Sequence, residues 1–219
     1  MKKRKIGLKE ERELWKKGYK YIAGLDEAGR GPLAGPVVAV AVMISKKPQF
    51  KIKNLLKETK DSKRLSTKKR EKLYQFLNKN SNIEWGIGRV SEKIIDKINI
   101  LEATKLAMKR AVKKLETRSK KQETRIDFVI LDGNLKIDLP IPQKSIIKAD
   151  NKVFSCAAAS IIAKVKRDEM MKRYHKKYPQ YGFDKHKGYG TELHRKMLKK
   201  YGPCKIHRKT FKPVKSLQK

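Results

Sequence analysis

The segment from Tyr21 to Val42 constrains the fold of this chain more than any other stretch. It consists of a short apolar run, the adjacent carboxylates Asp26 and Glu27, a glycine-rich turn and a second apolar run. Apolar runs rich in Val, Ile and Ala on either side of a Gly/Pro turn are typical of two buried strands. Acids at the end of a buried strand are costly unless a basic side chain or a metal ion meets them. The segment therefore predicts a sheet with a charged site at a strand end.

The rest of the chain predicts strands that alternate with helices. Further strands are expected at 83–90, 128–131 and 145–148. Helices are expected from Ser66, as the capping residue, to Leu77, across 94–115, and across 152–176. In the first of these, the side chains expected to face inward are Leu73, Phe76 and Leu77. This order predicts an α/β domain with a mixed sheet flanked by helices.

The two ends of the chain are basic and differ from the middle. Residues 1–18 are charged, and we expect a short helix there that packs on the body through Leu8, Leu14 and Trp15. Residues 178–219 contain several tyrosines and a basic tail, and we expect a small helical extension. The predicted organisation is a basic N-terminal segment (1–18), a main domain (19–177) and a basic helical C-terminal extension (178–219).

The charge balance indicates a polyanionic partner. The chain has 58 Lys and Arg against 22 Asp and Glu, which gives a formal net charge of +36 over 219 residues. A compact fold with this imbalance repels itself unless it meets a polyanion, and nucleic acid is the obvious one. The alternative is the lysine-rich surface of thermophile proteins, but there lysine and glutamate rise together, whereas acids are scarce here.

Membrane and secretory classes are disfavoured. The longest apolar run, Val37–Ile44, is too short to span a bilayer, and the basic N-terminus lacks the apolar segment of a secretion signal. The two cysteines are far apart in sequence, and Cys156 lies among small apolar residues, as expected of a buried thiol. We therefore expect a cytoplasmic protein, in a reducing compartment.

Four carboxylates are the candidate catalytic and metal-binding residues: Asp26, Glu27, Asp132 and Asp150. All four lie at predicted element boundaries, and ligand sites in open α/β sheets gather at strand ends. Magnesium and manganese favour such oxygen ligands. Because adjacent strand residues point to opposite faces, Asp26 and Glu27 can share one site only if the strand breaks there, which the following glycines permit.

Each acid also has a structural interpretation, which we favour for any one of them alone. Asp150 is suited to cap a helix, Asp132 to begin a turn, and the Asp26–Glu27 pair to form a salt bridge with Arg30. Jointly, the four acids have no equally economical structural account. The histidines show no zinc-binding spacing. Asp168 and Glu169, amid Lys166, Arg167 and Lys172, are interpreted as ordinary helix-face charges.

Short motifs follow one another along nearly the whole chain, at residues 25–37 (LDEAGRGPLAGPV), 61–66 (DSKRLS), 98–101 (INIL), 131–134 (LDGN), 148–150 (KAD), 158–168 (AASIIAKVKRD), 186–191 (HKGYGT) and 207–211 (HRKTF). In this order they resemble ribonuclease HII, the bacterial type 2 ribonuclease H. The intact Gly-Arg-Gly at 29–31 favours this family over the related type 3 enzymes.

The resemblance implies a ribonuclease H-like fold and a metal-dependent endonuclease. The implied reactions are hydrolysis of the RNA strand of RNA–DNA hybrids and incision 5′ to single ribonucleotides in duplex DNA, leaving 3′-hydroxyl and 5′-phosphate ends. The four acids match the family's catalytic, metal-binding set, and our hypothesis is that two Mg²⁺ or Mn²⁺ ions bind there with the substrate. One ion would prepare a hydroxide for attack, and the other would stabilise the departing oxygen. We expect a monomer.

The resemblance also implies a set of substrate-binding residues. Gly29, Arg30 and Gly31 match the element that contacts the 2′-hydroxyl region at the RNA–DNA junction, and Tyr189 matches the tyrosine that senses the same junction. Backbone groups in a glycine turn can approach a sugar closely, and an aromatic ring can stack without reading sequence. Without the resemblance, Tyr189 would be interpreted as a surface tyrosine. Phosphate contacts are expected from Lys63, Arg64, Lys164 and the tail at 205–215.

Two rival functions remain open. One is a different metal-dependent nuclease on the same fold, such as a resolvase, which would prefer a branched junction. The other is a non-catalytic basic nucleic-acid-binding protein, which would bind equally well in EDTA and cut nothing.

Overall fold

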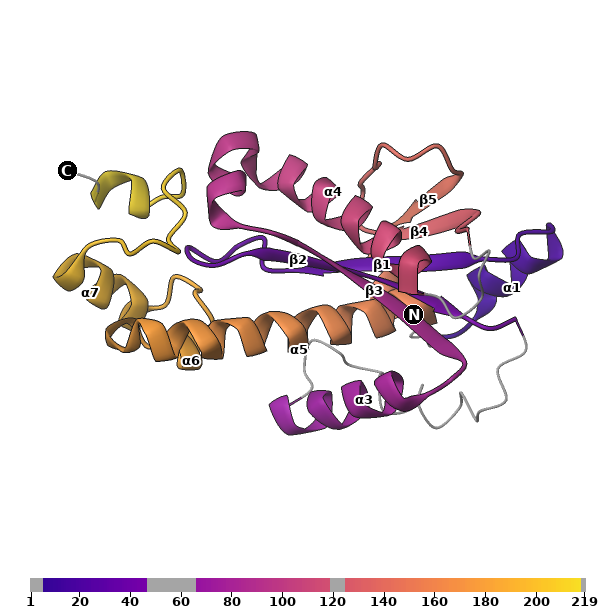
Figure 1. Ribbon diagram of the computed structural model, residues 1–219, viewed down its shortest axis with the longest axis horizontal. Coiled ribbons are helices and arrows are strands. Elements are labelled where there is room, and N and C mark those ends of the chain that lie inside the picture. Colours follow the sequence, from indigo (N-terminus) through magenta and orange to yellow (C-terminus); the bar gives the residue numbers. More distant parts are fainter. Residues whose placement is uncertain (1–5, 47–65, 119–124, 218–219) are drawn as a thin grey trace, which may run out of the picture.

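A five-stranded mixed sheet forms the centre of the protein (Figure 1). The computed structural model describes residues 6–46, 66–118 and 125–217. The strand order is β3-β2-β1-β4-β5; β2 is antiparallel to both of its neighbours, whereas β1, β4 and β5 are parallel. The predicted α/β class with a mixed sheet is confirmed. The strands are β1 (Ile22–Ala28), β2 (Val37–Ile44), β3 (Ile83–Val90), β4 (Phe128–Asp132) and β5 (Gln143–Ile146).

Helices cover both faces of the sheet. The helix α4 (Glu92–Arg118) packs on one face, and α5 (Phe154–Lys177) with α3 (Thr67–Lys79) on the other (Figure 1). Glycines bring these layers close, because a Cβ on Gly86 would stand 2.2 Å from the Leu115 backbone nitrogen, and one on Gly24 2.2 Å from the Ser155 hydroxyl. The smaller elements are α1 (Lys9–Lys16), η1 (Ala149–Asn151), η2 (Pro179–Tyr181), α6 (Phe183–His186), α7 (Glu192–Tyr201) and η3 (Val214–Leu217).

Strand alternation divides the core into two halves. In β2, Val40 and Val42 join the cluster on the α5 side, whereas Ala39 and Ala41 join the cluster on the α4 side. In β1, Leu25 belongs to the α4 side. The next residue along β1, Asp26, therefore points toward α5.

The N-terminal helix α1 packs on the body as predicted, with Leu8, Leu14 and Trp15 buried. It also brings a buried carboxylate to the start of α5. An oxygen of Glu11 accepts hydrogen bonds from the backbone N–H of Ser155 (3.0 Å) and from its hydroxyl (2.8 Å). Since Val153, at the N-cap of α5, has no side-chain acceptor, Glu11 supplies the cap from outside the helix.

Several predicted boundaries need correction. The first strand was expected to end at Leu25 but runs to Ala28, and the strand expected at 145–148 is β5 (Gln143–Ile146), since Lys148 adopts a left-handed conformation with φ 58°. Ser66 caps α3 as predicted, and Leu73 and Leu77 are buried. Phe76 is 44% exposed, however, because it lies on the side of α3 away from the core.

The predicted helix across 94–115 is interrupted at Asn99, which has φ 63° and ψ 170°. Its side-chain oxygen accepts from the backbone N–H groups of Leu101 (2.8 Å) and Glu102 (3.1 Å). Asn99 therefore ends the first part of α4 and caps the second part.

The C-terminal extension packs against the far end of α5 and against the turn that follows β1 (Figure 1). Ala34 in that turn forms an isolated β-bridge with His207, and the Gly35 N–H donates to the Ile206 carbonyl at 2.8 Å. The extension is thus attached directly to the glycine-rich segment. Among the described residues, no helix has the length and apolar character that a membrane span requires.

Candidate active site

Asp26, near the end of β1, and Asp132, the last residue of β4, lie side by side on neighbouring parallel strands. The β1–β4 register pairs Leu25 with Leu131, so the next residue of each strand is the carboxylate. Asp132 ends β4, and Asp26 is buried beneath α5. The strand-end argument made from the sequence therefore predicted the correct neighbours.

Asp26 is held in an environment that opposes its negative charge. Burial raises its pKa well above the usual value, and the charges of Glu27 and Asp132 raise it further. Two hydrogen bonds to its carboxylate lower the pKa of Asp26. One comes from the hydroxyl of Ser160 on α5, and the other comes from the Glu27 N–H at 2.7 Å. The three carboxylates are therefore close enough to repel one another.

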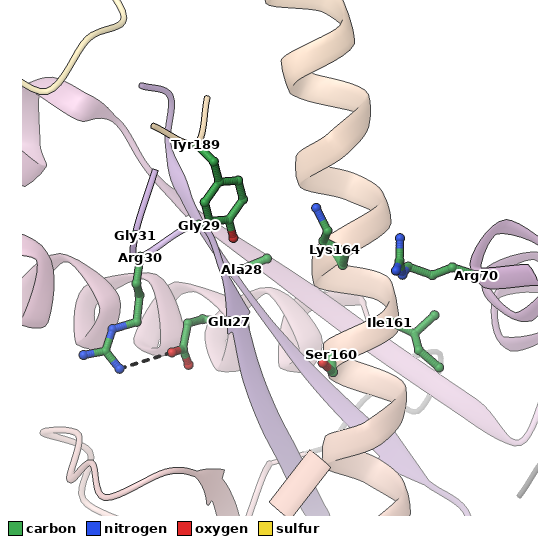
Figure 2. A pocket seen from close by; sticks show the side chains of 10 residues that line it. All are labelled: Glu27, Ala28, Gly29, Arg30, Gly31, Arg70, Ser160, Ile161, Lys164 and Tyr189. Carbon is green, nitrogen blue, oxygen red and sulfur yellow. Dashed lines mark hydrogen bonds and ion pairs between the residues drawn. The ribbon is translucent and has the colours of Figure 1, made fainter. Parts of the chain in front are cut away.

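Glu27 reaches the same region although β1 does not break between the two acids. The strand break that was the condition for a shared site is not present at the two acids, because pairing with β2 continues through Ala28. One oxygen of Glu27 lies 3.3 Å from Arg30 Nη1, so the salt bridge considered from the sequence is present (Figure 2). The other oxygen, Oε2, is buried without a hydrogen-bond partner among the described residues. Burial raises the pKa of Glu27, while Arg30 opposes the rise.

Asp150 is brought to this edge of the sheet by a hydrogen bond to Asp132. The Ala149 N–H donates to Asp132 Oδ1 at 2.6 Å, and Asp150 follows directly in η1, fully buried. The N-cap interpretation of Asp150 is wrong, because α5 begins only at Phe154 with Val153 at its cap. The local-turn interpretation of Asp132 is also incomplete, because its carboxylate bonds across 17 residues.

These carboxylates have the chemistry of a magnesium or manganese site. The candidate donors are all carboxylate oxygens, and the buried Oε2 of Glu27 is available to a cation. Within residues 6–46, 66–118 and 125–217, no three His, Cys, Asp or Glu side chains are arranged closely enough to hold an ion by themselves.

A pocket of about 380 Å³ opens beside Glu27 (Figure 2). The glycine turn and the ring of Tyr189 form one side, and Lys164 and Arg70 lie across from them. Acid, glycine turn, aromatic ring and basic side chains thus surround one space. Its lining residues are Glu27, Ala28, Gly29, Arg30, Gly31, Arg70, Ser160, Ile161, Lys164 and Tyr189.

Three residues at or beside the pocket were not among the predicted site residues: Arg70, Ser160 and Arg167. The Arg167 side chain is only 1% exposed, so it is not part of an ordinary helix face. The available signal was its spacing of four from Ala163 and from Met171, both of which are buried on the same stripe of α5. Lys63 and Arg64 lie outside the described residues.

Comparison with known proteins identifies the family. The family model described as Ribonuclease HII matches residues 23–214. Ribonuclease HII of Chlamydia muridarum is 52% identical over 200 residues, covering 91% of this chain and 86% of the relative. Ribonuclease HII of Caldanaerobacter subterraneus subsp. tengcongensis is 49% identical over 201 residues, covering 92% and 78%.

Solved structures confirm the ribonuclease H-like fold. The crystal structure of ribonuclease H2 from Pyrococcus horikoshii OT3 matches with a TM-score of 0.68 and 28% identity, covering 90% of this chain and 96% of that one. The chain therefore belongs to the ribonuclease HII family, and it is a ribonuclease H, an endonuclease that acts on RNA–DNA hybrids.

Proposed function

We propose that this ribonuclease also incises duplex DNA on the 5′ side of a single embedded ribonucleotide, leaving 3′-hydroxyl and 5′-phosphate ends. The observation that carries the proposal is the composition of the pocket, in which Glu27 faces a space bounded by Gly29–Gly31 and Tyr189. Distinguishing RNA from DNA at one nucleotide requires reading a 2′-hydroxyl. A glycine turn next to the acids brings backbone groups to the sugar beside the scissile phosphate.

The four acids Asp26, Glu27, Asp132 and Asp150 are the proposed ligands of two divalent ions, Mg²⁺ or Mn²⁺. Such ions, when bound, lower the pKa of water and neutralise charge on a departing oxygen. The support in this chain is the all-carboxylate donor set, the buried Oε2 of Glu27, and the pKa of Asp26, which is raised first by burial and further by the charges of Glu27 and Asp132. Ser160 orients Asp26 by donating to its carboxylate.

The remaining pocket residues bind the nucleic acid. Lys164 and Arg70 face the space from the α5 and α3 side, where they place positive charge for phosphates. Gly29, Arg30 and Gly31 contact the sugar of the ribonucleotide, and the Tyr189 ring stacks beside it. Lys63 remains a proposed phosphate contact, although it lies outside the described residues.

We also propose that the protein works as a monomer in the cytoplasm on RNA–DNA hybrids and on ribonucleotide-containing duplex DNA. The support for a monomer is that residues far apart in the sequence, from Glu27 to Tyr189, already meet in one pocket of a single chain. Cys156 and Cys204 are free thiols, which is consistent with a reducing compartment.

The decisive test compares four substrates of one sequence: a hybrid, a duplex with one ribonucleotide, an all-DNA duplex and a branched DNA junction. Each is incubated with Mg²⁺, Mn²⁺ or EDTA, and the cut position and end groups are mapped. We expect cutting of the first two with either metal, 5′ to the ribonucleotide in the second, and none in EDTA. Equal cutting of the all-DNA duplex, or preference for the branched junction, would refute the proposal.

A further inference from the structure

Two buried arginines lie behind the pocket, and neither touches the space where substrate binds. Arg167 on α5 is 1% exposed, and Arg208 in the C-terminal extension is fully buried. Neither forms an ion pair within 4.0 Å with any carboxylate of the described residues. A buried guanidinium without a carboxylate partner is costly unless its donors are satisfied in another way.

Backbone carbonyls of the glycine-rich segment satisfy these donors. Arg208 donates to the carbonyl oxygens of Gly29 (2.5 Å), Arg30 (2.7 Å) and Gly35 (2.9 and 3.0 Å). From the other side, Arg167 donates to those of Ala34 (3.1 Å) and Pro36 (3.0 Å). The planar fork of a guanidinium makes several such bonds at once, which an ammonium group on a flexible stem cannot do in the same geometry.

This arrangement fixes the direction of the peptide groups at the pocket wall. In a trans peptide, the N–H points opposite to the C=O of the same unit. Because the carbonyls of Gly29 and Arg30 point toward Arg208, the N–H groups of Arg30 and Gly31 point away from it. Gly29, Arg30 and Gly31 all line the pocket, so these N–H groups are directed to the side where a sugar would lie.

Arg167 also connects the glycine turn to Tyr189. Its Nη1 donates to the Lys187 carbonyl at 3.0 Å, and its guanidinium carbon lies 5.9 Å from the centre of the Tyr189 ring. The approach to the turn is close, since a Cβ on Gly29 would stand 2.1 Å from Arg167 Nε. One side chain therefore sets the spacing between the two substrate-reading elements.

We propose that Arg167 and Arg208 are positioning residues that hold the glycine turn and Tyr189 in the arrangement that selects which phosphodiester is cut. They determine which phosphodiester is cut and take no part in its hydrolysis. This inference rests on the proposed reading of the 2′-hydroxyl. The simplest alternative is that both arginines only attach the C-terminal extension to the body.

The test uses a duplex in which one strand carries four consecutive ribonucleotides flanked by DNA. The measured quantity is the ratio of the main cut to the neighbouring cuts within that strand under single-hit conditions. Because all cuts come from the molecules that are active, this ratio does not depend on the folded fraction. The variants are Arg208→Lys and Arg167→Lys. Arg110→Lys is the matched control, since Arg110 also donates to a carbonyl, that of Arg89 at 2.7 Å, outside the pocket.

We expect the ratio to fall by about tenfold or more in either pocket variant and to stay unchanged in Arg110→Lys, because a misplacement of about 1 Å in a positioning element is costly to catalysis. A reduced total rate with the wild-type ratio would overturn the inference and leave a structural role. If Arg208→Lys yields no folded protein, Arg167→Lys carries the same comparison. Failure of the wild-type enzyme to cut the one-ribonucleotide duplex would instead refute the proposed function.

Discussion

The side chains of His194 and His207 meet with 3.0 Å between their Nε2 atoms, and their other hydrogen bonds decide which of the two donates. The Cys204 N–H donates to His207 Nδ1 at 2.9 Å, so the proton of neutral His207 is on Nε2. His194 Nδ1 lies 2.9 Å from the carbonyl oxygen of Tyr189, which can only accept. His194 therefore accepts from His207, and the chain of bonds ends on a residue of the pocket.

This pair predicts a loss of stability in mild acid. Burial is the largest cause that lowers the pKa of both His194 and His207 to about 4. Between pH 6.5, the usual pKa, and about pH 4, these two histidines are protonated in the unfolded chain but not in the folded chain. The free energy of unfolding should therefore fall as the pH falls. Urea unfolding measured from neutral pH down to about pH 4.5 should show this fall.

Carboxylates with raised pKa values titrate in the same pH range, and they change the free energy of unfolding in the opposite direction. A substitution is therefore needed to isolate the contribution of the histidines. His207→Gln keeps an acceptor for Cys204 and a donor for His194 but does not titrate. It should flatten the pH dependence of unfolding.

Asp132→Asn should nearly abolish cleavage, by on the order of a thousandfold or more, while hybrid binding stays largely intact. The amide retains an oxygen that can accept from the Ala149 N–H, so the fold is kept, whereas the charge needed for a metal is lost. Single-turnover cleavage and fluorescence anisotropy on the hybrid measure the two effects. Asp138→Asn, a substitution at a fully exposed acid of the segment after β4, should retain full activity. Substantial turnover by Asp132→Asn would rule out its assignment.

Gly29→Ala should lower the stability of the fold, whereas Gly31→Ala should lower cleavage in a protein that remains folded. Gly29 has φ 100°, and its Cβ would collide with Arg167, so the substitution should destabilise the fold by about 1–3 kcal/mol. A Cβ on Gly31 meets only Tyr189 Cε1, at 3.8 Å, so thermal unfolding should be nearly unchanged. Cleavage should nevertheless fall, because the methyl group enters the pocket. Wild-type activity in Gly31→Ala would contradict the placement of the sugar there.

Tyr189→Ala should weaken binding of a ribonucleotide-containing duplex more than it weakens binding of plain DNA. Stacking of an aromatic ring is worth about 1–3 kcal/mol, so the ratio of the two dissociation constants should drop by roughly tenfold. Tyr189→Phe retains the ring and should retain the ratio. Tyr201→Ala removes a tyrosine of similar exposure outside the pocket and serves as the control.

Binding should weaken steeply with salt, by on the order of a thousandfold between low and physiological concentrations if six or more phosphates are contacted. Lys164→Gln should reduce the slope of log affinity against log salt by about one, because Lys164 lines the pocket. Lys113→Gln, on an exposed position of α4 on the other face of the sheet, should not change the slope. An identical slope in all three proteins would remove Lys164 from the phosphate contacts.

The sequence predicted the parts of the site that depend on local pattern. Apolar runs ending in acids placed Asp26 beside Asp132, because parallel strands bring their carboxyl ends to one edge. The end of β1 was predicted too early, since pairing with β2 extends the strand past its apolar residues. Arg208 could not be placed from pattern, because its partners are carbonyls 173 to 179 residues away. Phe76 was misjudged because only packing decides which apolar residue of a short helix stays outside.

The carboxylate of Glu11 at the head of α5 links the beginning of the chain to the hydrolytic centre. That helix carries Ser160, which orients Asp26, and Arg167, which contacts the glycine turn. Its first turn is completed by an acceptor 144 positions earlier in the sequence. Removing α1 would therefore leave the first turn of α5 without its hydrogen-bond acceptor. The helix that supports the candidate acids would then unwind at its N-terminal end.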